Sequence, residues 1–221
     1  MNLTRREALG MLLRLALGLP VLLGLAWLGG RDYATFFVPL YKWVLGLALP
    51  DFRVLSLDIR FGHEYVFATE VIAEHVQVLY GQLLPAGFTI QASTPMTIAL
   101  IHPIVLALAA LVWPRLSWRG RLLRVLASLP LLVLLEMLDV PLVLASSIHG
   151  LLSFNLAPNG ISAPWLVEWV HVMDGGGRFA LSIAAAVGAA GLQRVVTAGR
   201  VGGGCGLRLI ALLASPIYSL K

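Results

Sequence analysis

Four apolar stretches constrain this chain of 221 residues more than any other feature, because each is close to or above the length that crosses a hydrocarbon core of about 30 Å. The stretches are Met11–Leu28, Met96–Trp113, Leu122–Ile148 and Gly177–Leu192. The chain is 59% hydrophobic and 12% charged, with a mean hydropathy of +0.88. This composition excludes an ordinary soluble domain and predicts a membrane all-α bundle of about four transmembrane helices.

The basic residues fall almost entirely on alternate sides of these stretches. Loops rich in Lys and Arg are retained in the cytoplasm, so we expect a multi-pass protein of the bacterial inner membrane with both termini cytoplasmic. The net charge of +5 is then an orientation signal, and no nucleic-acid partner is expected. The cytoplasmic side collects Arg5, Arg6, Arg14, Arg115, Arg119, Arg121, Arg124, Arg194, Arg200, Arg208 and Lys221, and the outer side keeps Arg31, Lys42, Arg53, Arg60 and Arg178.

The predicted spans divide the chain into six segments. In order, these are a cytoplasmic tail with an uncleaved first span (1–30), an interfacial helix with a small β-rich periplasmic domain (31–95), spans two and three with a basic turn (96–148), an outer loop that hugs the membrane (149–176), span four (177–197), and a glycine-rich linker with a segment on the inner surface (198–221). The single cysteine, Cys205, excludes an internal disulfide.

The outer segment combines a helical and a β-type pattern. Tyr33–Leu49 is apolar and aromatic, but a span here would invert every later loop, so we expect a helix that lies in the membrane interface. Apolar and polar residues alternate over Phe52–Arg60 as in a half-buried strand. With Glu64–Tyr80 and Phe88–Ala92, this pattern predicts an antiparallel sheet of three or four strands. A helix over Thr69–Leu79 is the alternative.

Two carboxylates lie inside the third span, where an ionisable side chain costs several kcal/mol unless it is paired, protonated or facing a cavity. Glu136 and Asp139 are three residues apart and therefore share one helical face. His102 lies at a similar depth in the second span, and Arg178 begins the fourth. We expect at least one carboxylate to be protonated, or Arg178 to be drawn inward as its counter-charge. The cluster is either a proton relay or catalytic pocket, or a polar knot that holds the helices together.

The remaining polar residues carry weaker signals. His63, His75, His149 and His171 all lie on the outer side, but their spacing matches no metal-ligand pattern, so neither a metal nor a cofactor is expected. The run from Gly175 to Gly177 is expected to be a flexible start to the fourth span. Within that span, Ala184 and Gly188 are four residues apart and suit close helix packing.

The region Phe88–Gly150 consists of an outer segment, a span, a basic turn from Trp118 to Leu123, and a polar span that ends at His149-Gly150. This layout resembles that of the exosortase and archaeosortase group of membrane transpeptidases. In that family a cysteine begins the first of these spans and an arginine follows an asparagine by three in the next. Here the corresponding regions read Ala-Ser-Thr-Pro (92–95) and Glu-Met-Leu-Asp (136–139). In that family a histidine lies further along the chain, and His149 is the one residue here that matches the family's residue type.

Without the thiolate and its positive partner, covalent acyl transfer by that route is not expected. The resemblance implies a non-catalytic relative or an exosortase-associated membrane protein. We therefore expect a non-enzymatic accessory or structural subunit that lies in the bilayer and binds another integral membrane protein or a second copy of itself. The alternative is a small membrane enzyme or proton-coupled carrier that uses Glu136, Asp139 and His102, with Arg178 and His149 as further candidates.

Overall fold

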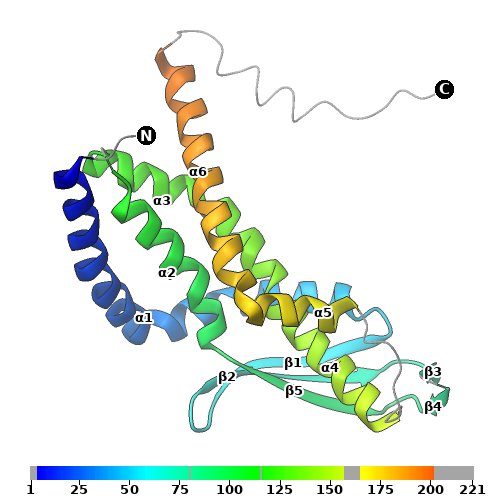
Figure 1. Ribbon diagram of the computed structural model, residues 1–221. Helices are drawn as coiled ribbons and strands as arrows, with labels where there is room; N and C mark the ends of the chain where they lie inside the picture. Colours follow the sequence, from blue (N-terminus) through cyan, green and yellow to red (C-terminus); the bar gives the residue numbers. More distant parts are fainter. Residues whose placement is uncertain (1–3, 80, 115, 157–164, 202–221) are drawn as a thin grey trace, which may run out of the picture.

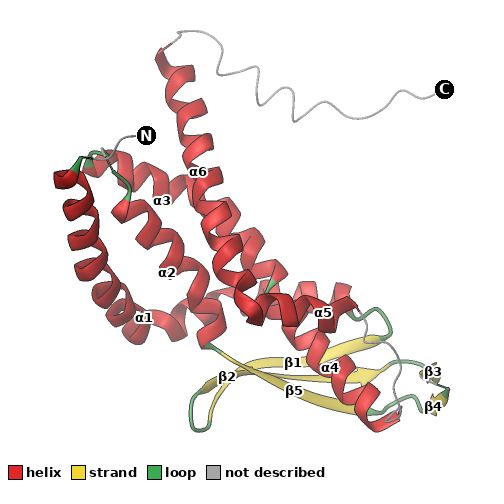
Figure 2. Cartoon of the chain, in the orientation of Figure 1, coloured by secondary structure: helices red, strands yellow, loops and turns green. Residues whose placement is uncertain are grey.

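The computed structural model describes residues 4–79, 81–114, 116–156 and 165–201. Helices form most of the protein and a small antiparallel sheet lies at one end (Figures 1 and 2). The helices are α1 (Arg5–Ala48), α2 (Thr97–Val112), α3 (Trp118–Leu138), α4 (Val140–Leu156), α5 (Trp165–Val172) and α6 (Arg178–Val201), with a π-helical turn η1 (Met173–Gly177) before α6. The start of α1, the α2–α3 turn and the end of α6 lie together at the opposite end from the sheet (Figure 1).

The first helix joins two segments that we expected to be separate. α1 runs for 44 residues and starts with a capping box in which Thr4 and Glu7 bond each other's backbone N–H groups. It bends so that its first half lies beside α2 and its second half turns toward the sheet (Figure 1). The second half buries Ala34, Phe37 and Tyr41 at helical spacing. The segment expected as a separate helix is therefore helical as the continuation of the first apolar stretch, and its position in the membrane interface stays a prediction.

Three helical stretches among the described residues are long and apolar enough to cross a membrane: Arg5–Ala48, Trp118–Leu156 and Trp165–Gln193. The expectation of four such helices is met only in part, because the second span forms α2, with 16 residues. Strand β5 continues to Pro95 and shortens the helix at its start, and Pro114 follows its end. At a rise of 1.5 Å per residue, α2 is about 24 Å long and does not cover the full hydrocarbon core.

The third expected span consists of two helices with a break at Asp139. This residue caps α3, its N–H donates to the Leu135 carbonyl (3.0 Å), and its own carbonyl accepts from Val143 N–H (2.9 Å). The break follows from Pro141, which has no N–H to donate and disfavours helical geometry in the residue before it. α4 then continues past the end of the expected span to Leu156.

The expected sheet is confirmed. β1 (Phe52–Phe61), β2 (Tyr65–Ala73) and β5 (Thr89–Pro95) pair antiparallel in the order β1-β2-β5, and β3 (Gln77–Leu79) and β4 (Gln82–Leu84) form a separate hairpin. The helical alternative for 69–79 is wrong, because Thr69 to Ala73 belong to β2 and alternate between buried and half-buried positions.

The outer loop expected over 149–176 is largely helical in its described part, where α4 ends and α5 begins. Residues 157–164 lie outside the described residues. So do Cys205 and the segment 207–220 that we expected on the inner surface. The linker expected to start at Ala198 is still part of α6 as far as Val201.

The main core lies between the sheet and two helices. Buried residues of β2 pack against the second half of α1 and against α4, and the sheet is drawn across their ends in Figure 2. Phe67 is completely buried and its ring lies edge-on to Tyr41, with 5.4 Å between the ring centroids. Because β2 is the central strand, this contact ties the sheet to α1.

Truncation of this contact should loosen the sheet from the helices. We expect Phe67→Ala to destabilise the protein by about 3–5 kcal/mol, because it removes a buried ring and leaves a cavity. The matched control is Phe61→Ala, since Phe61 is 71% exposed at the end of β1. Thermal unfolding in detergent checks the prediction, and equal midpoints for the two variants would contradict it.

Candidate functional site

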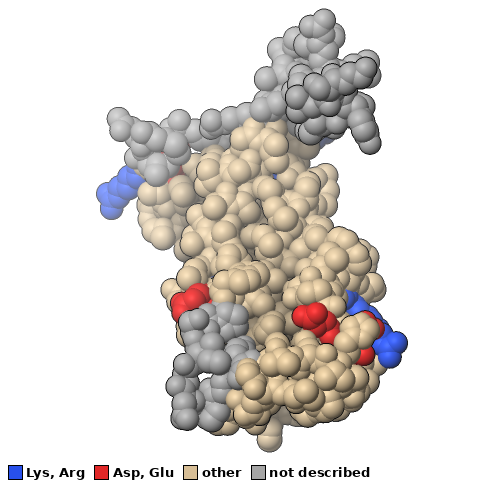
Figure 3. Space-filling model, turned by 90° about the vertical axis from the view of Figure 1, so that its right-hand side faces the viewer, with Lys and Arg blue, Asp and Glu red and all other residues tan. Residues whose placement is uncertain are grey.

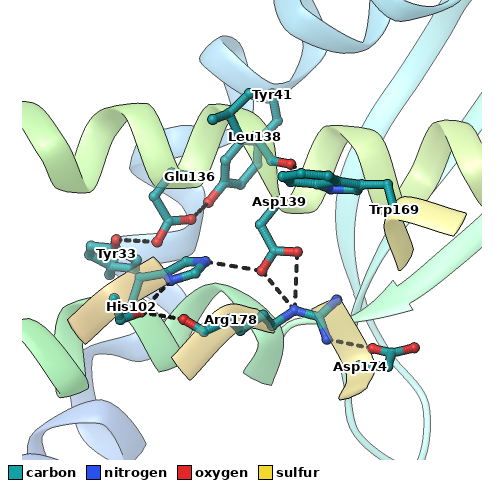
Figure 4. A network of polar contacts seen from close by, with 10 residues as sticks. Tyr33, Tyr41, His102, Glu136, Leu138, Asp139, Trp169, Asp174 and Arg178 are labelled. Atoms are coloured by element: carbon teal, nitrogen blue, oxygen red, sulfur yellow. Dashed lines mark hydrogen bonds and ion pairs between the residues drawn. The ribbon is translucent and has the colours of Figure 1, made fainter. Parts of the chain in front are cut away.

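The ionisable residues singled out within the apolar stretches of the sequence meet in one polar cluster (Figure 4). Glu136 and Asp139 come from the end of α3, His102 from α2 and Arg178 from the start of α6. All four are buried, with 0% exposure for His102 and Glu136, 2% for Asp139 and 6% for Arg178. Three further residues complete what we call the polar cluster: Tyr33, Tyr41 and Ser182.

Glu136 is held by two tyrosines of α1. Tyr33 Oη donates to Oε1 at 2.7 Å, and Tyr41 Oη donates to Oε2. Both oxygens of the Glu136 side chain therefore have a hydrogen-bond partner, because each phenol gives its single proton. The pair also fixes the rotation of the second half of α1 against α3. Glu136 therefore connects the first span to the third.

Asp139 binds the basic residues of the cluster. Arg178 Nε donates to both carboxylate oxygens, at 3.0 Å to Oδ1 and 2.8 Å to Oδ2, and His102 Nε2 lies 3.0 Å from Oδ2. Arg178 Nη1 also bonds Asp174, whose side chain is 61% exposed. Arg178 is thus drawn inward as a counter-charge, and Asp174 links it to the surface. Its Nη2 is buried without a hydrogen-bond partner among the described residues.

The π-helical turn explains how Asp174 and Arg178 reach the same place. Gly176 has a φ of +108°, which side chains rarely allow, and a Cβ on Gly177 would lie 2.5 Å from the Val172 carbonyl oxygen. Both positions therefore require glycine. The glycine run that we expected to be a flexible start to the fourth span is a defined kink between α5 and α6, where Gly176 leaves the helical conformation.

His102 joins Asp139 to Ser182 in an order that resembles a Ser–His–Asp triad. Nδ1 of the imidazole lies 2.7 Å from Ser182 Oγ on one side, and Nε2 contacts Asp139 on the other. However, Ser182 Oγ donates its proton to the Arg178 carbonyl at 2.8 Å, so the imidazole does not take it. Ser182 also has 0% exposure, and an attacking oxygen must reach its substrate. The arrangement fits a structural hydrogen-bond chain better than a nucleophile.

Not every candidate from the sequence belongs to the cluster. His149 is half-buried on α4, and no hydrogen bond in the described structure joins it to Asp139 or its partners. Among the described residues, no three His, Cys, Asp or Glu side chains lie close enough to hold a metal ion. Trp169 of α5 adds a contact that sequence reasoning did not find: its Nε1 donates to the Leu138 carbonyl (3.1 Å) beside the helix break.

The tyrosines and Ser182 also went unrecognised in the sequence. Tyr33 and Tyr41 lie about two helical turns apart in an apolar run, a spacing that puts both hydroxyls on one face. Ser182 follows Arg178 by four residues and so shares its face. Helical spacing from Arg178 was the signal that could have identified Ser182, whereas only the tertiary fold brings the two tyrosines to Glu136.

The two carboxylates on Arg178 provide a matched test of the cluster. We expect Asp139→Asn to destabilise the protein by about 3–5 kcal/mol, because it leaves a buried guanidinium without its main counter-charge. Asp174→Asn removes a mostly exposed partner of the same guanidinium and should change stability by about 0–1 kcal/mol. Thermal unfolding and folded yield in detergent measure both, and equal effects would contradict the burial argument.

Comparisons of this chain with protein-family models, with curated proteins and with solved structures find no match.

Proposed function

We propose that this protein is a non-enzymatic, multi-pass subunit of an inner-membrane protein complex. The observation that carries the proposal is the closed state of the polar cluster. Glu136, His102 and Ser182 have 0% exposure, and the oxygens of Glu136 and Asp139 are already bonded to groups of the same chain. A cluster that is closed to substrate and satisfied internally supports a role in holding the helices together.

Surfaces that the chain does not use for its own packing support the role in a complex. On α6, Ala186, Ala189 and Ala190 are buried against the bundle, whereas Ala184 and Gly188 face outward together with Ile183 and Val187. Ala184 is therefore exposed, and a Cβ on Gly188 would lie 3.6 Å from the Leu131 side chain. Small residues on an outward face let a helix of another chain approach closely in the bilayer.

The sheet offers a second contact surface. Its outward face carries a groove of about 260 Å³, lined by Arg60, Val66, Ala68, Glu70, Gln91 and Ser93 among others. The small side chains Ala68 and Ser93 are paired across β2 and β5 at its centre, and charged or amide side chains surround them. A polar rim around a shallow centre suits contact with a folded partner outside the membrane.

The charge distribution supports the orientation that we propose. Arg5, Arg6 and Arg14 lie at the start of α1, and Arg119, Arg121 and Arg124 lie at the start of α3. We propose that this end faces the cytoplasm. The sheet then lies in the periplasm. Figure 3 shows one face whose middle, among the described residues, lacks charged side chains, while acidic and basic side chains gather over the sheet. Such an uncharged band is what a bilayer core requires.

The layout of the region 88–150 supports an association with an exosortase-type system. The segment that would supply the nucleophile, 92–95, lies in β5 and contains Ser93 and Thr94 in place of a thiol. The position of the required arginine is occupied by Asp139, which here binds Arg178. We propose a non-catalytic associate of such a system rather than a transpeptidase.

A second candidate function rests on Arg178 Nη2, the buried donor that has no partner among the described residues. It lies beside the Asp139–His102–Ser182 chain, so an acidic group of a substrate could bind there and exchange protons with it. This protein would then be a small membrane enzyme or a proton-coupled carrier. Asp139→Asn separates the two functions: the carrier or enzyme loses activity at unchanged folded yield, whereas the subunit loses folded yield.

Purification in mild detergent from the native membrane tests the subunit proposal. We expect an integral membrane partner, or a second copy, to co-purify in a fixed ratio. Ala184→Leu should weaken this association about tenfold or more, because a larger side chain separates the two helices. Ala16→Leu, at an exposed alanine of α1, is the matched control and should leave the ratio unchanged. A monomer from which nothing co-purifies would contradict the proposal.

A further inference from the structure

An apolar groove lies between α1 and α2 at the end of the bundle far from the sheet. It has a volume of about 400 Å³ and is lined by Met11 of α1 together with Ala109, Val112, Trp113 and Pro114 at the end of α2. Cavities of about 300–1,000 Å³ are the size of small-ligand sites. No polar side chain is among these five residues, so the groove suits a hydrocarbon chain.

Arginines lie on the helices next to this groove. Arg14 follows Met11 by three residues, and both are half-buried on the face of α1 that also carries the buried Gly18. Arg14 lies close enough to Arg121 of α3 for the two charges to repel each other. The Nε of Arg121 is buried and has no hydrogen-bond partner among the described residues. Two neighbouring guanidinium groups, one of which has an N–H donor without a partner among the described residues, favour the binding of an anion.

The protein supplies little negative charge there. Glu7 is the only carboxylate in the segments 4–18 and 113–124, and its Oε2 accepts from the Thr4 backbone N–H in the capping box. Arg124, on the same face of α3 as Arg121, donates to Gln193 and stacks its guanidinium over Trp113, with 4.2 Å from Cζ to the ring centroid. The stacking holds this wall of the groove in place.

In the proposed orientation this end of the bundle faces the cytoplasm, where the phosphates of the inner leaflet lie. Trp113 lines the groove and Trp118 is 70% exposed next to it, and tryptophan is enriched at the membrane–water interface. We infer that this end of the bundle binds one anionic phospholipid, with an acyl chain between α1 and α2 and its phosphate between Arg14 and Arg121. Basic sites between helices on the cytoplasmic side bind lipids of this class.

Native mass spectrometry of the full chain in detergent tests the inference with two lipids that have the same acyl chains, phosphatidylglycerol and phosphatidylcholine. We expect one phosphatidylglycerol to bind per chain, in preference to phosphatidylcholine. The double variant Arg14→Gln/Arg121→Gln should lower phosphatidylglycerol binding about tenfold or more. The control Arg53→Gln/Arg60→Gln changes two arginines of β1 and should leave binding unchanged.

A second variant separates the acyl chain from the phosphate. Met11→Trp fills the groove and should reduce binding of both lipids, without any change at the arginines. Thermal midpoints should stay unchanged or rise in Arg14→Gln/Arg121→Gln, because the substitutions remove a repulsion. The inference fails if the two lipids bind equally, or if inorganic phosphate displaces phosphatidylglycerol while Met11→Trp has no effect. It also fails if a second copy of the chain fills the groove, seen as a dimer that Met11→Trp dissociates.

Discussion

Burial of ionisable groups in an apolar bundle is the constraint on which the rest of this structure depends. A carboxylate in such surroundings is stable only with a partner, and every partner of Glu136 and Asp139 comes from another helix. α1 supplies the tyrosines, α2 the histidine and α6 the arginine. Lipid tails are as apolar as leucine, so hydrophobic burial alone selects no register between helices. The polar cluster provides that selection.

The irregular backbone of the bundle follows from the same requirement. Asp139 lies where α3 breaks before Pro141, and Arg178 follows the only π-helical turn in the described residues. Each irregularity changes the direction of a helix at the residue that must reach its partner. Trp169 also bonds the Leu138 carbonyl next to the break, where the regular helical hydrogen-bond pattern is interrupted. The breaks in the helices and the pairing of the charged side chains in this region therefore depend on each other.

Residue patterns in the sequence were sufficient for the sheet and for the meeting of His102 with Asp139, because strand alternation and depth in a short helical hairpin are local properties. They were not sufficient for α1. The sequence predicted a first span over Met11–Leu28 and a separate helix over Tyr33–Leu49, but burial of Ala34, Phe37 and Tyr41 in the main core stabilises one continuous helix through both regions. Tyr33 and Tyr41 escaped notice for a similar reason: only the tertiary fold places their hydroxyls on Glu136.

The two ends of the bundle are stabilised differently, and this difference bears on both proposals. Near the sheet, α1 is fixed by two tyrosine bonds to Glu136 and by the packing of Phe37 and Tyr41. At the other end its close approach to α2 is at Gly18, whose missing side chain admits Leu111, and beyond Gly18 the groove opens. No side chain of the described residues fills this groove, and the nearby side chains of Arg14 and Arg121 repel each other. A lipid that fills the groove and neutralises the arginines would complete the contact between α1 and α2. The stability of a subunit that is held together by its own charges would then also depend on the lipids of the surrounding membrane.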